Sequence, residues 1–168
     1  MATIPIPPFL AHLPVDSRGY PVPFFVAKRG EHYDFIHMDE RKQQQAIQDH
    51  LCHICGKELS PRQSWYVITG PTGYKNRVVS DPPMHKDCAA YALQVCPHLL
   101  YQKAERKDDG TGKIHPAMQL GKPDSIYLIA IMPFIHVQRV PGLGVFIHFK
   151  PTSYTEYIYV NNRLELKE

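Results

Sequence analysis

The sequence contains no long hydrophobic run. Among its 168 residues, no apolar stretch approaches the roughly 20 residues that a membrane-spanning helix needs, and the longest candidate, 126–132, is closed by Pro133. Residues 1–14 lack the basic start of a secretory signal, and prolines interrupt their apolar stretch. We therefore expect a cytosolic protein with no membrane partner.

Cysteine is also scarce, with four residues against ten histidines and sixteen prolines. In a cytosolic protein, so few cysteines indicate metal ligands or buried thiols before disulfides. The sequence has no G-x-x-x-x-G-K-[ST] loop, no G-x-G-x-x-G fingerprint and no G-x-S-x-G elbow. These absences remove the common sequence signatures of nucleotide-binding proteins and of serine hydrolases.

The composition is otherwise that of an ordinary globular protein. Hydrophobic residues make up 43% of the chain and charged residues 21%, which excludes a mostly disordered chain and favours one domain over residues 1–168. The formal net charge of +3 is too small to indicate nucleic-acid binding by itself. Residues 52–123 carry 10 basic and 6 acidic side chains, so the basic excess lies in the middle of the chain.

The N-terminal part is predicted to contain an arm, a hairpin and a helix. Residues 1–23 are rich in proline and apolar residues, which predicts an extended arm packed along the domain surface. Strands at 23–27 and 33–38 would form a hairpin. Asp39 then caps a helix that runs to about Leu51 and delivers the chain directly to the first cysteine.

The C-terminal part, 125–168, is predicted to be β-rich. It follows a polar loop at 101–124, which is the segment where we most expect disorder. The predicted fold class is α+β, with two short helices and a mainly antiparallel sheet built from the C-terminal strands and the N-terminal hairpin. Proline, glycine or asparagine separates the C-terminal strands, which are 126–132, 134–139, 145–149, 154–160 and 163–167.

The middle of the chain is predicted to form a second hairpin and then a helix. Residues 64–69 are mostly β-branched or aromatic, 70–73 carry turn residues, and 74–80 would return as the second strand. Asp81 followed by two prolines indicates a helix start, and Pro97 indicates its end.

The run C-H-I-C-G at residues 52–56 carries the strongest functional signal. A C-x-x-C turn brings two sulfurs onto one ion, and the glycine after it allows the positive φ that such a turn needs. His85 and Cys88 come later in the chain, and on a helix positions i and i+3 face the same way. Together with Cys52 and Cys55 they make the closed tetrahedral ligand set of a structural Zn²⁺.

Other interpretations of these residues remain open. The cysteines could be buried thiols at a chance spacing, or residues 52–55 could be a thioredoxin-like redox pair, although that motif should follow a strand and open a helix. Cys96 and His98 could be further ligands, but Cys96 is in register with the apolar side of the predicted helix and fits the core better. His53, inside the turn, is expected to be exposed to solvent.

The order of cysteine knuckle, hairpin and helix over residues 52–96 resembles the treble-clef zinc finger. That resemblance implies a structural zinc site, and it also raises the zinc-dependent HNH nucleases, which use the same fold, as the competing class. Their family places a general-base histidine in the hairpin, whereas residues 56–84 contain no histidine. Asn76 and Arg77 could contact phosphate but do not replace that base, so we expect a non-catalytic protein.

Treble clefs often serve as platforms for nucleic acid or for protein. A nucleic acid would use cations for its phosphates and aromatic rings for its bases, although ordinary packing explains these rings better. A protein partner would use the tyrosine-bearing strand 154–160 or the terminal strand 163–167 as an edge. The candidate cations are Lys57, Arg62, Lys75, Arg77 and Lys86, and the candidate aromatic residues are Trp65, Tyr66 and Tyr74.

Several short segments of the first hundred residues resemble small uncharacterised proteins of bacteriophages and prophages. Besides the knuckle, the resemblance rests on A-H-L-P at 11–14, G-Y-P-V-P-F-F-V at 19–26, S-D-P-P-M-H at 80–85 and C-A-A-Y at 88–91. It implies a phage-encoded accessory factor in a bacterial cytosol and lends no activity. Our interpretation is a non-catalytic zinc-binding protein that engages a host protein or nucleic acid.

Overall fold

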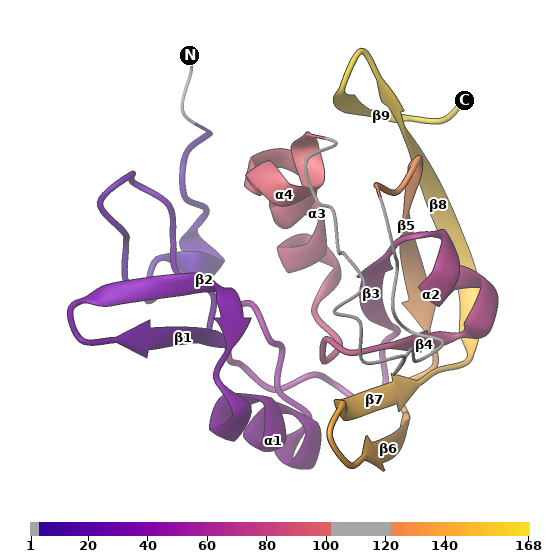
Figure 1. Ribbon diagram of the computed structural model, residues 1–168, viewed down its shortest axis with the longest axis horizontal. Coiled ribbons are helices and arrows are strands. Elements are labelled where there is room, and N and C mark those ends of the chain that lie inside the picture. Colours follow the sequence, from indigo (N-terminus) through magenta and orange to yellow (C-terminus); the bar gives the residue numbers. More distant parts are fainter. Residues whose placement is uncertain (1–3, 102–121) are drawn as a thin grey trace.

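The computed structural model describes residues 4–101 and 122–168 (Figure 1). These residues form an α+β fold in which all paired strands are antiparallel, which confirms the predicted class. The strands make three sheets, of two, four and three strands, and the described residues also include four short α-helices. None of these helices is both long enough and apolar enough to span a membrane. The predicted loop at 101–124 lies mostly outside the described residues.

The N-terminal hairpin forms as predicted but is a sheet of its own. Strands β1 (Val26–Arg29) and β2 (His32–Met38) pair only with each other, so the expectation that they join the C-terminal sheet is wrong. Instead, the backbone N–H of Phe24 donates to the carbonyl of Ile54 at 2.8 Å, and that of Phe25 donates to the carbonyl of His53 at 3.1 Å. These bonds tie the start of the hairpin to the cysteine knuckle.

The proline-rich arm contributes to the core as well as to the surface. A short 3-10 helix, Pro8–Leu10, follows the prolines, and the Leu10 side chain is 1% exposed within the main hydrophobic cluster. Phe9 and Leu13 pack partly buried against the same cluster. Proline restricts the backbone of the arm, and three of its apolar side chains lie inward while Ile4 and Val15 stay exposed.

Helix α1 (Glu40–Asp49) confirms the predicted cap. The Asp39 carboxylate accepts hydrogen bonds from the backbone N–H groups of Arg41 and Lys42, which have no partner within the helix. His50 adopts the left-handed conformation at φ 52° and ends the helix. The chain therefore turns sharply two residues before Cys52.

The four-stranded sheet has the order β3-β5-β8-β9. At one edge, Asn161 and Asn162 both have positive φ, at 50° and 65°, as a two-residue hairpin turn requires. The three-stranded sheet has the order β4-β7-β6. The strands of the first sheet are β3 (Trp65–Thr69), β5 (Ser125–Ile131), β8 (Pro151–Val160) and β9 (Arg163–Leu166), and those of the second are β4 (Val78–Val79), β6 (His136–Val140) and β7 (Gly144–His148).

The predicted central hairpin is wrong in its second half. After β3 the chain forms helix α2 (Pro71–Asn76), and β4 then pairs with β7 instead of returning along β3. A Cβ on Gly73 would lie 2.0 Å from Oγ1 of Thr69, so only glycine lets the helix fold back this tightly against β3. The segment after β4 does return to β3, through the antiparallel bridge between Met84 and Tyr66.

The next helix also begins later than its sequence signal. Helix α3 (Lys86–Val95) has His85 as its N-cap residue, so Asp81 and the two prolines precede the helix and do not open it. The prolines instead bring carbonyl groups to the knuckle, as described below. The end at Val95 agrees with the predicted stop before Pro97, which itself begins the short helix α4 (Pro97–Leu100).

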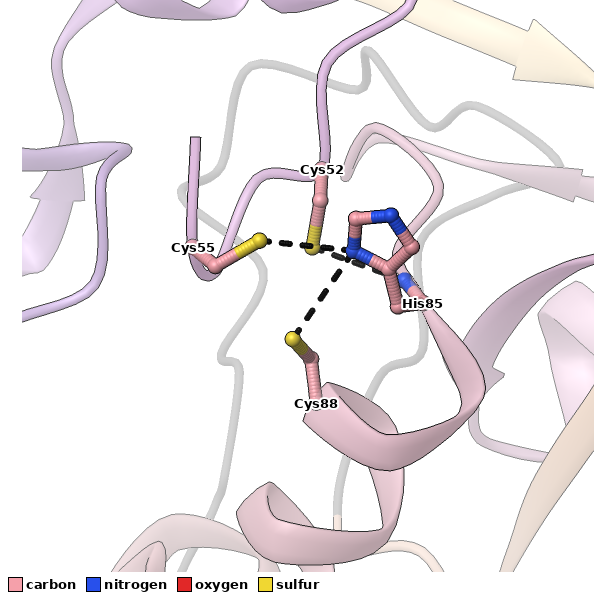
Figure 2. A group of neighbouring side chains, drawn as sticks. All are labelled: Cys52, Cys55, His85 and Cys88. Carbon is pink, nitrogen blue, oxygen red and sulfur yellow. Dashed lines mark hydrogen bonds between the residues drawn. The ribbon is translucent and has the colours of Figure 1, made fainter. Parts of the chain in front are cut away.

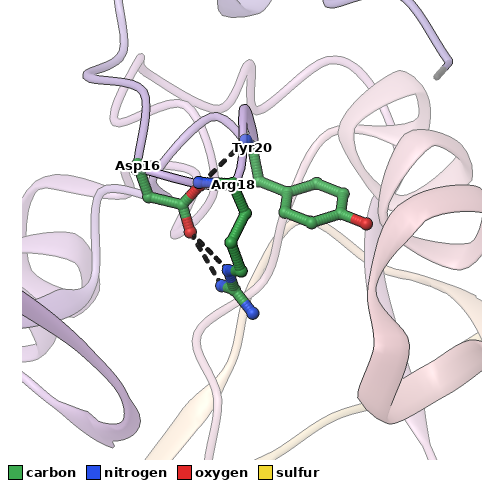
Figure 3. Close-up of polar contacts among 3 residues, drawn as sticks. All are labelled: Asp16, Arg18 and Tyr20. Atoms are coloured by element: carbon green, nitrogen blue, oxygen red, sulfur yellow. Dashed lines mark hydrogen bonds and ion pairs between the residues drawn. The ribbon is translucent and has the colours of Figure 1, made fainter.

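A small polar loop ties the arm to the hairpin (Figure 3). The Asp16 carboxylate accepts from the backbone N–H groups of Arg18 and Tyr20, at 2.9 and 3.0 Å, and pairs with the Arg18 guanidinium at 2.8 Å. The same guanidinium lies 5.0 Å from the ring centroid of Phe35 on β2. Burial acts to raise the pKa of Asp16, but the hydrogen bonds from Tyr20 and Arg18 outweigh it and the pKa is lowered.

We expect Asp16→Asn to lower the free energy of unfolding at pH 7 by about 1 kcal/mol, because the substitution weakens bonds that a charged acceptor makes. A lowered folded-state pKa stabilises the protein above the unfolded value near 4 and is lost as pH falls through the folded value. The difference from the wild type should therefore hold from pH 7 to about 5 and narrow below about 4. Denaturant unfolding measures the free energy of each variant, and Asp81→Asn, at an exposed site, is the control. Equal falls in the free energy of unfolding of both variants would contradict this role for Asp16.

Candidate metal centre

The cysteine knuckle is a closed backbone loop. The N–H of Cys52 donates to the carbonyl of Lys57 at 2.8 Å, and the N–H of Gly56 donates to the carbonyl of Cys52 at 2.8 Å. Gly56 has φ 74°, and a Cβ there would lie 2.8 Å from the ring of Phe24. Glycine is thus required both for the turn and for the approach of the N-terminal segment. The loop holds the two cysteine side chains at fixed positions.

The second pair of residues comes from the start of α3. His85 is the N-cap residue and Cys88 lies in the first turn, so both side chains face the knuckle. The residue before His85 fixes where the helix starts in space, because Met84 exchanges two backbone hydrogen bonds with Tyr66 on β3, at 2.8 and 2.9 Å. The helix itself packs against β3. The sheet therefore fixes where the helix begins relative to the knuckle.

The structure brings the four predicted ligands together (Figure 2). Their ligand atoms all lie within 4.8 Å of one another. Nδ1 of His85 is 3.3 Å from the sulfur of Cys55 and 4.0 Å from that of Cys88. Ligand atoms bound tetrahedrally at zinc's usual bond lengths are about 3.7 Å apart. The cluster, formed by Cys52, Cys55, His85 and Cys88, could therefore hold a metal ion.

The imidazole of His85 is oriented by a backbone carbonyl. Its Nε2 lies 3.0 Å from the carbonyl oxygen of Glu58, so Nε2 carries the proton that is donated and Nδ1 presents a lone pair to the sulfurs. Metal-bound histidines usually have such a partner on the second nitrogen. His12 contributes a further contact, between its Nε2 and the carbonyl of Cys55 at 2.7 Å. Both acceptors are backbone carbonyl groups, so no residue type in the sequence could have predicted these two contacts.

The electrostatics of the cluster favour a cation. Burial acts to raise the pKa of the Cys52 thiol, but hydrogen bonds from the other three side chains outweigh it, and the pKa is lowered. The hydrogen bond to Cys52 raises the pKa of Cys55, of Cys88 and of His85. Without a cation, negative charge on the Cys52 sulfur therefore opposes ionisation of the other two thiols. A divalent cation would let all three buried thiols ionise together.

The structure corrects the expectation that His53 is exposed. Its side chain is 3% exposed, Nδ1 is hydrogen-bonded to the carbonyl of Pro82, and the ring meets that of Phe25 edge-on at 4.7 Å. Its backbone N–H donates to the carbonyl of Pro83 at 3.3 Å. His53 therefore locks the knuckle between the N-terminal hairpin and the segment that leads to α3.

The other predicted candidates lie outside the cluster. Cys96 is a half-buried free thiol at the end of α3, where burial raises its pKa, and the exposed His98 lies in α4. Trp65 is 1% exposed and its indole N–H donates to the carbonyl of Ser60 at 2.9 Å, which confirms packing and removes it as a stacking surface. In the described parts of the chain, no second group of three or more metal-ligating side chains occurs.

A cleft of about 590 Å³ adjoins the candidate centre. Three of the four ligand residues line it, together with the exposed Lys57 and Lys86. The centre is thus close enough to solvent for a chelator to reach it, although its cysteine side chains are buried.

Comparison of the chain with protein-family models, with curated proteins and with solved structures gave no match.

We expect His53→Ala to destabilise the protein without changing its bound metal, because His53 packs and hydrogen-bonds beside the centre but supplies no ligand atom to it. The free energy of unfolding should fall by about 2–4 kcal/mol, as for other large-to-small substitutions of buried side chains. Denaturant unfolding and metal analysis of the folded fraction test this, with His98→Ala as the exposed control. Loss of metal from folded His53→Ala would contradict the prediction and show that the centre requires His53.

Proposed function

We propose that Cys52, Cys55, His85 and Cys88 bind one Zn²⁺ and that this ion has a structural role. The observation that carries the proposal is the approach of all four ligand atoms to within 4.8 Å, with His85 held in the required tautomer. Three thiolates and one imidazole form a common structural zinc set. Iron–sulfur clusters normally take four cysteines, so this donor set favours zinc over them.

A structural role follows from the number of ligands. Zinc in structural sites is four-coordinate, and these four side chains would fill every position, leaving none for a reactive water. The bound ion would join the knuckle to the first turn of α3 across 29 intervening residues. Knuckle and helix together support the treble-clef resemblance, although the hairpin between them is reduced to the Tyr66–Met84 bridge.

We further propose that the protein is a non-catalytic binding protein whose partner is a host protein or nucleic acid. The resemblance to phage and prophage proteins supports an accessory role in a bacterial cytosol. Four free cysteines among the described residues agree with a reducing compartment. Two features of the HNH nucleases lack support here: the hairpin is reduced to one bridge, and residues 56–84 contain no histidine to act as the base.

We expect purified protein to contain one zinc per chain and Cys88→Ser to lose it. Removal of one thiolate leaves three ligands and weakens the site strongly, and because metal-binding energy contributes to folding, the thermal transition should shift down as well. The matched control is Cys96→Ser, which removes a thiol outside the cluster and should keep one zinc. Metal analysis and thermal unfolding with and without a chelator give both readouts; zinc-free wild-type protein with an unchanged transition would overturn the proposal.

We expect no cleavage of DNA or RNA in the presence of Mg²⁺. The reason is that the four ligands would leave no metal position for a reactive water, and residues 56–84 supply no histidine for the general-base role. Incubation of plasmid DNA and of a folded RNA with zinc-loaded protein tests this on gels. Cleavage that disappears in His85→Ala protein would favour the nuclease instead.

A further inference from the structure

A cluster of three tyrosines lies where α2 meets the four-stranded sheet. The rings of Tyr74 on α2 and Tyr127 on β5 are stacked, with centroids 4.0 Å apart and planes 13° apart. Tyr154 on β8 meets Tyr74 edge-on at 5.1 Å and lies 6.0 Å from Tyr127. We call these three residues the tyrosine cluster.

The three tyrosine side chains differ in their exposure to solvent. Tyr74 and Tyr127 are half-buried against the core, whereas Tyr154 is 55% exposed, the highest value for any Phe, Tyr or Trp side chain in the described residues. Tyr154 lies opposite Ile129, which is fully buried, so the strand that carries it is firmly placed. An exposed aromatic ring on a rigid strand costs little conformational entropy on binding.

Two basic residues lie close to Tyr74 in the chain, and one of them contacts its ring. The Arg77 guanidinium lies 4.7 Å from the ring centroid of Tyr74, and the exposed Lys75 lies between these two residues in sequence.

The carboxylate beside the cluster is already compensated. Glu156 accepts a hydrogen bond from the Tyr127 hydroxyl at 3.2 Å and pairs with Lys167 at 2.9 Å. The free charge that faces a ligand at this place is therefore positive. Duplex nucleic acid hides the faces of its bases, whereas a single strand offers both base faces and phosphates.

We infer that the tyrosine cluster, with Lys75 and Arg77, binds single-stranded nucleic acid. An unpaired base stacks on Tyr154, and the phosphates beside it contact the two cations, as in other proteins that bind single strands without strict sequence preference. The inference rests on the proposed binding function and names its partner class. The surface is separate from the metal centre, because none of its residues belongs to the ligand set.

Fluorescence anisotropy with a labelled oligothymidine, an oligouridine and a duplex of equal charge tests the inference. The zinc-loaded wild type should bind both single strands more tightly than the duplex, and more weakly at about 200 mM than at about 50 mM salt. Tyr154→Ala should weaken single-strand binding by about 5- to 100-fold, and Lys75→Gln should reduce the salt dependence by about one phosphate contact.

Two variants serve as controls. Tyr154→Phe keeps the ring and should keep the affinity for single strands. Tyr33→Ala removes a ring on β2 that lies beside Lys28 of β1, and it should leave that affinity unchanged. Zinc content is measured on the same samples, so loss of zinc reports failure of the metal centre and not of this surface. The inference is overturned if the zinc-loaded wild type binds neither single strand at low salt, a result that would favour a protein partner. It is also overturned if the Tyr154→Ala variant binds single strands as tightly as the wild type.

Discussion

The fold depends on the meeting of two segments that are far apart in sequence, the knuckle at 52–57 and the start of α3. Three buried sulfurs and an imidazole face one another there, an arrangement that costs free energy unless protons or a cation hold the sulfurs together. Two neighbouring elements attach at this point. The N-terminal hairpin binds the knuckle through the backbone of Phe24 and Phe25, and β3 holds the approach to α3 through the Tyr66–Met84 bridge.

His53 shows how closely the knuckle is integrated. A residue inside a tight turn is usually solvated, yet here its ring fills the space between the hairpin and the carbonyl of Pro82. The two prolines, which looked like a helix start, have a different role. They donate no backbone hydrogen bond and keep the segment extended, so that their carbonyl groups point to the knuckle.

Local signals in the sequence predicted the elements they control. Asp39 caps α1, the Asn161-Asn162 turn joins β8 to β9, and the C-x-x-C-G spacing places the knuckle. These local signals could not predict which strands pair with each other. Val78 and Val79 suit a strand beside either β3 or β7, and the choice of β7 follows from Gly73, whose lack of a side chain lets α2 occupy the place of a direct return. The burial of His53 likewise depends on partners 29 residues away.

The candidate metal centre and the tyrosine cluster are linked through β3. Near the centre, β3 is fixed by the indole of Trp65 and by the bridge from Tyr66. At its other end it leads directly into α2, which carries Tyr74 and is followed by Arg77, and along its side it pairs with β5, which carries Tyr127. A metal ion that holds the start of α3 would thereby stiffen the strand that positions the tyrosines.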